Sequence, residues 1–345
     1  MKKFLALLLA LTMVLSLFAC GQKDTEKEDS NKEQTQDQTQ ADDKTPSGDY
    51  MSQAKELISQ AKYADAYALL CEHKSDKAAE DLLQDFTWVY ANYTYTNSER
   101  ANRNFTLEYI YDAQGNLTKE IRTDSDGKVW PTDYTYDADG NLTKEAATTV
   151  NGVENTAYTY DEGGNLTKMV CTDYNGKVST YDYTYNARSE KIKYAYTDPD
   201  GKVETHDCTY DAAGNLTKEV FTGSDGDVTT WEYTYNAKGE KEKYTYSANG
   251  KVNTYEYTYD AKGNLAKEIR TPSSGKVSTW EYTYDYDAQG NKVKEVRTTS
   301  DGLVYTYEWT YDANGNETKE VYTAPSGGVE TREYSGYKLF YKPQK

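Results

Sequence analysis

The sequence has few of the residues that most often build a dry core, a covalent framework or a catalytic site. Its 345 residues include only six phenylalanines, six prolines, four cysteines and two histidines. Four cysteines without a CxxC pair do not make a disulfide framework. His73 has no partner residue near it in the sequence, and we expect it at the surface.

Basic residues are also fewer than acidic residues. The chain has 39 lysines and arginines against 57 aspartates and glutamates, which gives a formal net charge of −18. Nucleic acids and anionic lipid surfaces attract cationic proteins, so this balance argues against both as partners. The simpler interpretation is that the excess of acidic residues keeps an exposed protein soluble.

The longest apolar run, Phe4–Phe18, lies at the N-terminus behind two lysines. It is too short for a stable transmembrane helix and has the charged start of a signal peptide. The segment Leu17–Cys20 is similar to the lipobox of bacterial lipoproteins. That resemblance implies that residues 1–19 are removed and that the Cys20 thiol carries a diacylglyceryl group. We therefore expect lipid anchoring at the extracytoplasmic face of a bacterial cell membrane; the alternative is a plain secreted protein with an incidental cysteine.

The segment between the lipobox and Tyr50 has no aromatic residue and almost no apolar one. Such a segment cannot bury enough surface to offset the entropy of ordering its chain. We expect residues 20–49 to form a lipid-anchored, disordered tether that holds the folded part away from the membrane.

Helical spacing of apolar residues begins after the tether. Ala54, Leu57 and Ile58 follow it, and neither proline nor glycine interrupts residues 50–87. The pattern predicts a small helical hairpin that looks like the helix pairs of tetratricopeptide repeats, with Asp76 placed to cap the last helix. One such unit cannot bury its own apolar face, so we expect it to pack on the first strands.

Residues 88–345 are dominated by tyrosine and by one repeated motif. The motif Tyr-Asp-x-x-Gly-Asn-Leu-Thr-Lys-Glu, or a close variant, begins nine times at steps of 24 to 27 residues, at Tyr111, Tyr136, Tyr160, Tyr185, Tyr210, Tyr235, Tyr259, Tyr286 and Tyr311. A fixed period of this length indicates a repeat array. Because the tyrosine hydroxyl prefers a partly hydrated site, 36 tyrosines against six phenylalanines predict a thin or hollow sheet.

Each repeat predicts two strands and two turns. Glycine recurs about every 12 or 13 residues and supplies the positive φ that tight hairpins require, and the short connections make neighbouring strands antiparallel. The sequence therefore predicts an all-β repeat array, an antiparallel meander or spiral sheet of about eighteen strands. Aromatic residues alternate cleanly in the return strands but change phase in the outgoing strands, so the buried face is left open.

The motif resembles the YD repeats of the Rhs family. Residues 210–217, Tyr-Asp-Ala-Ala-Gly-Asn-Leu-Thr, match its first turn, and residues 197–201 match its second turn. The resemblance extends from residue 111 to about residue 331. It implies strands wound into a sheet that can enclose a cargo or toxin, although large Rhs shells use many more than nine repeats.

Aromatic residues on the return strands are the candidate ligand-binding residues. Glycine-punctuated aromatic hairpins also look similar to the choline- and glucan-binding repeats of Gram-positive surface proteins, whose spacing is shorter. The rings can stack on sugar rings or peptide side chains; the alternative is that they only hold cross-strand pairs together. The candidates are Trp231, Tyr233, Tyr255, Tyr257, Trp280 and Tyr282.

No set of residues predicts catalysis, a metal site or a cofactor. His206 and Cys208 fall on one face of a strand and could form a nucleophile pair, but a spare histidine is the simpler interpretation. Turns such as residues 137–140, Asp-Ala-Asp-Gly, lack the full ligand set of a calcium loop and are explained as hairpin turns. We therefore expect a protein that is not an enzyme.

The sequence features together predict a surface-anchored binding or adhesion lipoprotein that presents a Tyr-rich repeat surface to a carbohydrate, cell-wall or protein ligand. The alternative function is a structural spacer or a component of a larger Rhs-like surface or toxin assembly.

Overall fold

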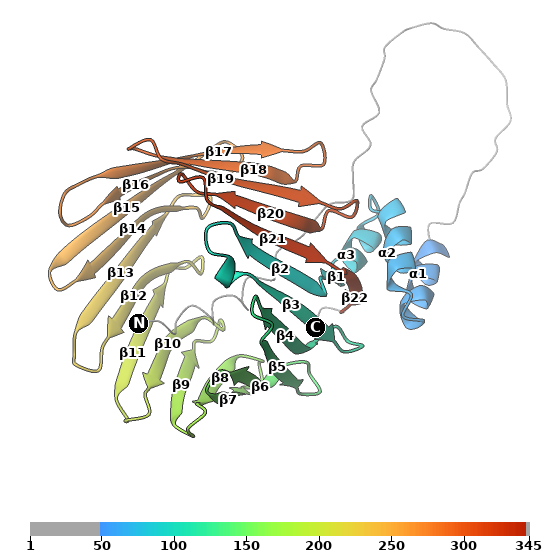
Figure 1. Cartoon of the computed structure of the whole chain (residues 1–345), viewed down its shortest axis with the longest axis horizontal. Coiled ribbons are helices and arrows are strands. Elements are labelled where there is room, and N and C mark those ends of the chain that lie inside the picture. Colours follow the sequence, from blue (N-terminus) through green and yellow to red (C-terminus); the bar gives the residue numbers. More distant parts are fainter. Residues whose placement is uncertain (1–48, 343–345) are drawn as a thin grey trace, which may run out of the picture.

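The computed structural model describes residues 49–342, so the predicted signal peptide and nearly all of the predicted tether lie outside the described residues. Three α-helices precede a long series of strands (Figure 1). None of the helices in this part of the chain is long and apolar enough to span a membrane. The helices are α1 (Asp49–Ser59), α2 (Tyr63–Glu72), α3 (Lys77–Leu83) and the short 3-10 helix η1 (Ala101–Arg103). The strands are β1 (Phe86–Val89), β2 (Asn92–Asn97), β3 (Phe105–Tyr111), β4 (Leu117–Asp124), β5 (Val129–Tyr136), β6 (Leu142–Thr149), β7 (Gly152–Tyr160), β8 (Leu166–Thr172), β9 (Val178–Tyr185), β10 (Lys191–Thr197), β11 (Val203–Tyr210), β12 (Leu216–Thr222), β13 (Val228–Tyr235), β14 (Lys241–Ala248), β15 (Lys251–Tyr259), β16 (Leu265–Thr271), β17 (Ser278–Tyr286), β18 (Lys292–Thr299), β19 (Val304–Tyr311), β20 (Glu317–Thr323), β21 (Val329–Ser335) and β22 (Lys338–Tyr341).

Strands β2 to β21 form one antiparallel meander that closes on itself. Each strand pairs with the next in sequence, and β21 pairs with β2 in the register Asn92↔Ser335 to Asn97↔Glu330. The predicted all-β antiparallel array is thus confirmed, and it is a closed barrel instead of a spiral. The nine repeats supply the eighteen strands β4 to β21, and β2 and β3 bring the total to twenty.

Each repeat consists of an outgoing strand and a return strand, and each strand is followed by its own kind of turn. The two kinds of turn therefore lie at opposite ends of the strands. The turns of the repeated motif, which we call YD turns, form one rim, and the intervening turns form the other (Figure 1). At the YD turns the strand register shifts, for example between Thr209 and Tyr210. Such a β-bulge offsets the alternation of side chains between two strands, so the faces of an outgoing strand cannot be assigned from those of the return strand before it.

Alternate residues of the strands face opposite sides of the barrel wall. In β13, exposed Val228, Glu232 and Thr234 alternate with half-buried Trp231 and Tyr233. Exposed residues lie on the convex outer face, whereas the concave inner face crowds its side chains together. The aromatic residues of the return strands therefore face the inside of the barrel. This is the buried face of the sheet, which the sequence did not assign.

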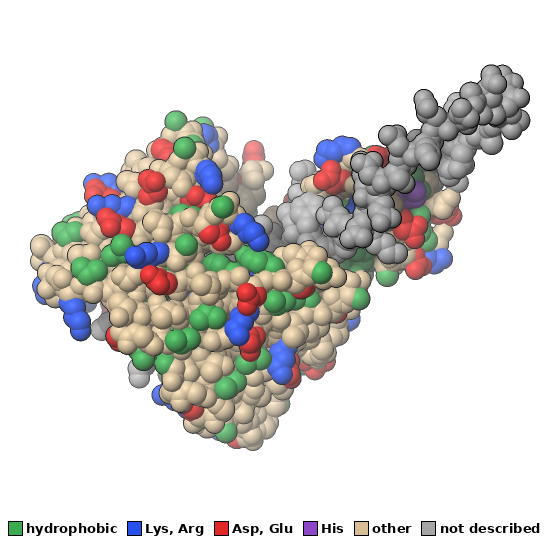
Figure 2. Space-filling model, turned by 90° about the horizontal axis from the view of Figure 1, so that it is seen from above, with side chains coloured by type: hydrophobic (Ala, Val, Ile, Leu, Met, Phe, Trp, Pro, Cys, Tyr) green, Lys and Arg blue, Asp and Glu red, His purple; other side chains and the backbone are tan. Residues whose placement is uncertain are grey.

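Ion pairs between neighbouring strands cover the outer face. They join the lysine of the motif to an acidic residue of the next return strand, with Nζ–O distances between 3.0 and 3.7 Å. Figure 2 shows basic and acidic side chains lying close together on one face of the molecule. Exposed pairs of this kind add little stability each and keep the outer surface hydrated. The pairs are Lys119–Asp133, Lys168–Asp182, Lys193–Asp207, Lys218–Glu232, Lys294–Glu308 and Lys319–Glu333.

The barrel has no conventional dry core. At about 4.8 Å per strand, twenty strands give a circumference of roughly 100 Å, and barrels of this strand number leave open space inside. Most inner side chains are half-buried, and Tyr109 and Met169 are among the few that are nearly covered, at 7% and 3% exposure. The preference for tyrosine over phenylalanine fits this partly hydrated interior.

The apolar core lies in the helical part, which has three helices instead of the two of a hairpin. Ala54, Ala66 and Leu70 are fully buried there and pack with Phe86 of the small sheet β1–β22. The Asp76 side chain caps α3 by accepting a hydrogen bond from the backbone of Ala78, as predicted. This unit sits at the rim formed by the YD turns (Figure 1).

Candidate functional site on the inner wall

The six candidate aromatic residues all lie on the inner wall of the barrel. They come from the return strands β13, β15 and β17, and each is half-buried and has at least one exposed neighbour on its own strand. The outgoing strands β14 and β16 separate these return strands. The structure therefore brings the candidates together on one stretch of wall about five strands wide.

The faces of most of these rings are already occupied. Trp231 packs against Tyr246 with ring centroids 5.8 Å apart, and the Tyr244 ring lies between Tyr233 and Tyr255, at 5.3 and 5.0 Å. Trp280 has Tyr305 at 5.3 Å and the Arg270 guanidinium at 4.7 Å. Cross-strand packing thus uses the ring faces and leaves edges and hydroxyl groups toward the interior.

Glutamates and arginines, which were not among the predicted binding residues, share this wall. Glu268 is 7% exposed, and its carboxylate accepts hydrogen bonds from Arg270 Nε at 2.6 Å and from the Tyr282 hydroxyl at 3.0 Å. Burial, together with the Glu268 charge, raises the pKa of Tyr282 to about 12. The final glutamate of the motif lies one residue beyond the lysine, so it points inward where the lysine points outward. The sequence alone did not show which way the lysine points.

His206 and Cys208 do not form a nucleophile pair. The His206 Nδ1 atom lies 2.6 Å from Glu219 Oε1, and its ring stacks on Tyr194 with centroids 4.1 Å apart. Burial raises the pKa of the Cys208 thiol, which favours the unreactive protonated form. His206 therefore acts as a packed and hydrogen-bonded wall residue.

The tyrosine that opens each motif has a structural role. Its hydroxyl donates a hydrogen bond at 2.8 or 2.9 Å to a backbone carbonyl near the start of an outgoing strand in the preceding repeat, and so fixes successive repeats to each other. In the first repeat, Tyr111 bonds the carbonyl of Tyr90, just before β2. In the repeat with the 27-residue step, Tyr284 makes this bond and Tyr286 instead reaches the Asn264 side chain. The donor and acceptor pairs are Tyr111–Tyr90, Tyr136–Leu117, Tyr160–Leu142, Tyr185–Leu166, Tyr210–Lys191, Tyr235–Leu216, Tyr259–Lys241, Tyr284–Leu265 and Tyr311–Lys292.

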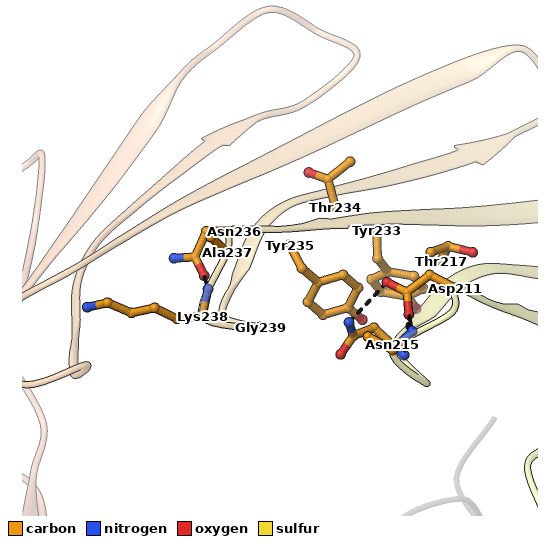
Figure 3. Close-up of a pocket in the computed structure, with 11 residues that line it drawn as sticks. Asp211, Asn215, Thr217, Tyr233, Thr234, Tyr235, Asn236, Ala237, Lys238 and Gly239 are labelled. Atoms are coloured by element: carbon orange, nitrogen blue, oxygen red, sulfur yellow. Dashed lines mark hydrogen bonds between the residues drawn. The ribbon is translucent and has the colours of Figure 1, made fainter.

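The aspartate of the motif holds the YD turn together. Asp211 Oδ1 accepts hydrogen bonds from the backbone N–H groups of Ala213 and Asn215, and Asn215 Nδ2 donates to Asp211 Oδ2 at 3.0 Å. These bonds lower the pKa of Asp211, with the Asn215 side chain as the largest cause. Both carboxylate oxygens are engaged within the turn, which agrees with the hairpin explanation of the Asp-rich turns. Figure 3 shows this turn beside the next one, with an open depression between them.

Two turns carry the same arrangement with the charge exchanged. In the turn after Tyr235, Asn236 takes the place of the aspartate, and its Nδ2 donates to Glu240 Oε2 at 2.6 Å. Asn186 and Glu190 repeat this exchange, also at 2.6 Å. The aspartate–asparagine pair has become an asparagine–glutamate pair, so each turn keeps one carboxylate and one amide.

The exchanged pair gives a stability prediction. Asn236→Asp alone places two carboxylates against each other and is expected to lower the free energy of unfolding by about 1 kcal/mol. Adding Glu240→Asn restores the pair found in the other turns and should return stability to that of the wild type. Urea unfolding of both variants tests this, and equal stabilities of the single and the double variant would contradict it.

Comparisons with known proteins agree with the repeat architecture. The RHS Repeat family model matches residues 111–154 and 286–329, about a quarter of the chain, and supports the resemblance of these repeats to Rhs repeats. No curated protein sequence matches the chain.

Several solved structures are similar in outline. A porin-like protein from Bacteroides uniformis is 15% identical, with 71% of this chain and 97% of that chain covered and a TM-score of 0.35. One from Bacteroides vulgatus is 12% identical, with 74% and 99% covered and a TM-score of 0.30. A TcdB2-TccC3 structure is 16% identical, with 65% and 15% covered and a TM-score of 0.34, so the chain spans a small part of that protein. All these scores are low, and the fold described above depends on its own strand pairing.

Proposed function

We propose that this protein is a lipoprotein that captures a ligand on the inner wall of its barrel without catalysing a reaction. The observation that carries the proposal is the shared placement of the candidate aromatic residues with inward carboxylates and arginines on one concave surface. Such a surface offers hydrogen bonds, charge and apolar contact, which are the elements of a recognition site. The captured ligand is a carbohydrate, a cell-wall component or a protein.

The anchor in this proposal is Cys20, whose lipid would hold the barrel at the extracytoplasmic face of the cell membrane. The lipobox at Leu17–Cys20 and the polar segment that follows it support this part. Metabolic labelling with a fatty-acid probe should label the wild type and not Cys20→Ala, and an unlabelled wild type would refute the anchor.

A second candidate function is that of a part in a larger Rhs-like surface or toxin assembly. The family match to residues 111–154 and 286–329 favours it. Affinity purification from native membranes distinguishes the two, because an assembly component co-purifies with fixed partners whereas a receptor is recovered alone.

The binding function predicts that inner and outer residues of the same strands differ in importance. Trp280→Ala with Tyr257→Ala removes two inner rings and is expected to weaken ligand binding on a glycan, cell-wall and peptide array at least tenfold. The matched control is Thr258→Ala with Glu281→Ala, the adjacent outward residues, which should leave binding within about twofold of wild type. Equal losses in both variants would argue against an inner site.

A further inference from the structure

The inner wall has two halves that differ in how their carboxylates are neutralised. We call the stretch from β16 through β21 to β2 the paired half. On it Glu295 lies 2.5 Å from Arg297 Nε and 2.8 Å from Lys292 Nζ, and Glu320 lies 2.8 Å from Arg332. Each of these glutamates has its own cation, which reduces the negative charge of this half.

In the stretch from β5 to β15, the unpaired half, the inward lysines do not pair with glutamates. The ammonium groups of Lys191 and Lys241 lie instead over the rings of Tyr194 and Tyr233, at 4.8 and 5.1 Å. Glu145, Glu204 and Glu219 lie on its inner face, and among residues 49–342 none of them has an ion pair with lysine or arginine. Glu145 accepts a hydrogen bond from the Tyr158 hydroxyl at 3.1 Å, and Glu219 contacts His206. No arginine occurs on any strand of this half.

Much of the difference is encoded two residues after the glutamate of the motif. Residues i and i+2 of a strand share a face, so the Glu-x-Arg sequence of Glu268 and Arg270 makes its own inward ion pair. In the unpaired half the same position holds Ala147 after Glu145 and Phe221 after Glu219. The residue at this repeat position therefore decides whether a motif glutamate pairs within its own strand. Glu320, which is followed at this position by Tyr322, pairs instead with Arg332 of the next strand.

The aromatic rings between these glutamates are packed on one another. Tyr194 stacks on His206, and Tyr181 lies 4.8 Å from Tyr196, centroid to centroid. Their faces are therefore not free to stack on sugar rings. Hydroxyl groups, ring edges and uncompensated carboxylates remain, and these are acceptors for a cation that donates hydrogen bonds.

We propose that the unpaired half of the inner wall binds an extended basic peptide, whose lysine or arginine side chains pair with Glu145, Glu204 and Glu219. The proposal rests on the binding function above and names its ligand. Glu145 on β6 and Glu219 on β12 are six strands apart, roughly 25–30 Å along the wall. An extended chain of about nine residues covers that span. The chain's own segment 21–48 has eight acidic residues and four lysines, so its charge does not fit this wall.

The test measures binding of nine-residue peptides to the full-length protein in detergent at physiological salt, by calorimetry. The peptides alternate serine with lysine or with glutamate, and a glucosamine oligomer is the cationic sugar probe. Two variants remove the same charge by the same chemistry, and circular dichroism checks their folding. The inner variant is Glu145→Gln/Glu204→Gln/Glu219→Gln, and the outer variant is Glu232→Gln/Glu256→Gln/Glu281→Gln, at exposed positions.

The lysine peptide should bind the wild type, bind the inner variant at least tenfold more weakly and bind the outer variant within about twofold of wild type. The glutamate peptide should not bind. Equal weakening in both variants would show attraction by net charge alone and overturn the proposal, as would tighter binding of the glucosamine oligomer. If instead a neutral glycan of the array described above binds and Trp280→Ala abolishes that binding, the binding function stands and the basic-peptide ligand is wrong. If no probe binds, both fail.

Discussion

Replacing Gly115 with alanine is expected to lower the free energy of unfolding by about 3 kcal/mol. Gly115 lies in the first YD turn at φ +75°, a left-handed conformation that costs alanine about 1–2 kcal/mol. A Cβ atom there would lie 2.6 Å from Cγ of Phe340, on β22 of the small sheet. This overlap adds the cost of displacing a packed side chain, typically about 1–3 kcal/mol.

Gly140 provides the matched control, because it occupies the same position in the next YD turn. Its φ is +82° and an added Cβ would meet nothing within 4 Å, so alanine there should cost only the conformational term. Urea unfolding measures both variants, and hydrogen exchange at β1 and β22 reports whether the helical part loosens in Gly115→Ala. Equal destabilisation by both replacements would show that the contact between Phe340 and the turn contributes nothing.

Glu317 is expected to make the protein less stable as the pH rises toward neutrality. It occupies the repeat position that holds leucine or lysine elsewhere, such as Leu216. Burial, reinforced by the Glu320 charge and opposed by Arg332 and Lys292, raises its pKa from 4.5 to about 7. The folded state therefore binds a proton more tightly than the unfolded state, and the stability from this proton is complete below pH 4.5 and lost as the pH rises to 7.

Glu317→Gln removes this dependence and should be more stable than the wild type at pH 8. The shift is equivalent to at most about 3 kcal/mol, and solvent screening reduces the expected gain to about 1–2 kcal/mol. Glu295→Gln is the contrasting variant. Burial opposes ionisation of Glu295, but hydrogen bonds from Lys292 and Arg297 lower its pKa, so this variant should lose stability at pH 8. Unfolding measured from pH 4 to pH 8 tests both signs, and a gain by both variants would contradict the assignment.

The repeat period and its turn residues were sufficient to predict the antiparallel array, because hairpins are set by local sequence. The closed form was not predictable, since it depends on pairing between Asn92 and Ser335, at opposite ends of the array. The inward direction of the motif glutamates was also hidden, because the β-bulge at each YD turn shifts the alternation between a return strand and the next outgoing strand.

The candidate aromatic residues could be grouped on one strand face from their alternation alone. Their neighbours could not be assigned, because cross-strand partners such as Tyr233 and Tyr244 depend on register. The sequence also gave no means to separate the tyrosines that bond a carbonyl of the preceding repeat from those that line the wall. That distinction depends on which hydroxyl groups lie within hydrogen-bonding distance of the preceding repeat, and only the folded barrel defines these distances.

Closure of the barrel also constrains the order in which the chain can fold. Each hairpin can form as soon as its own residues are available, and its motif tyrosine then attaches it to the repeat before it. Strand β2, in contrast, keeps an unpaired edge until β21 has formed. Free edges invite pairing with other chains, and contacts between distant residues form slowly. During folding the last repeat is therefore the one that protects the growing sheet from aggregation.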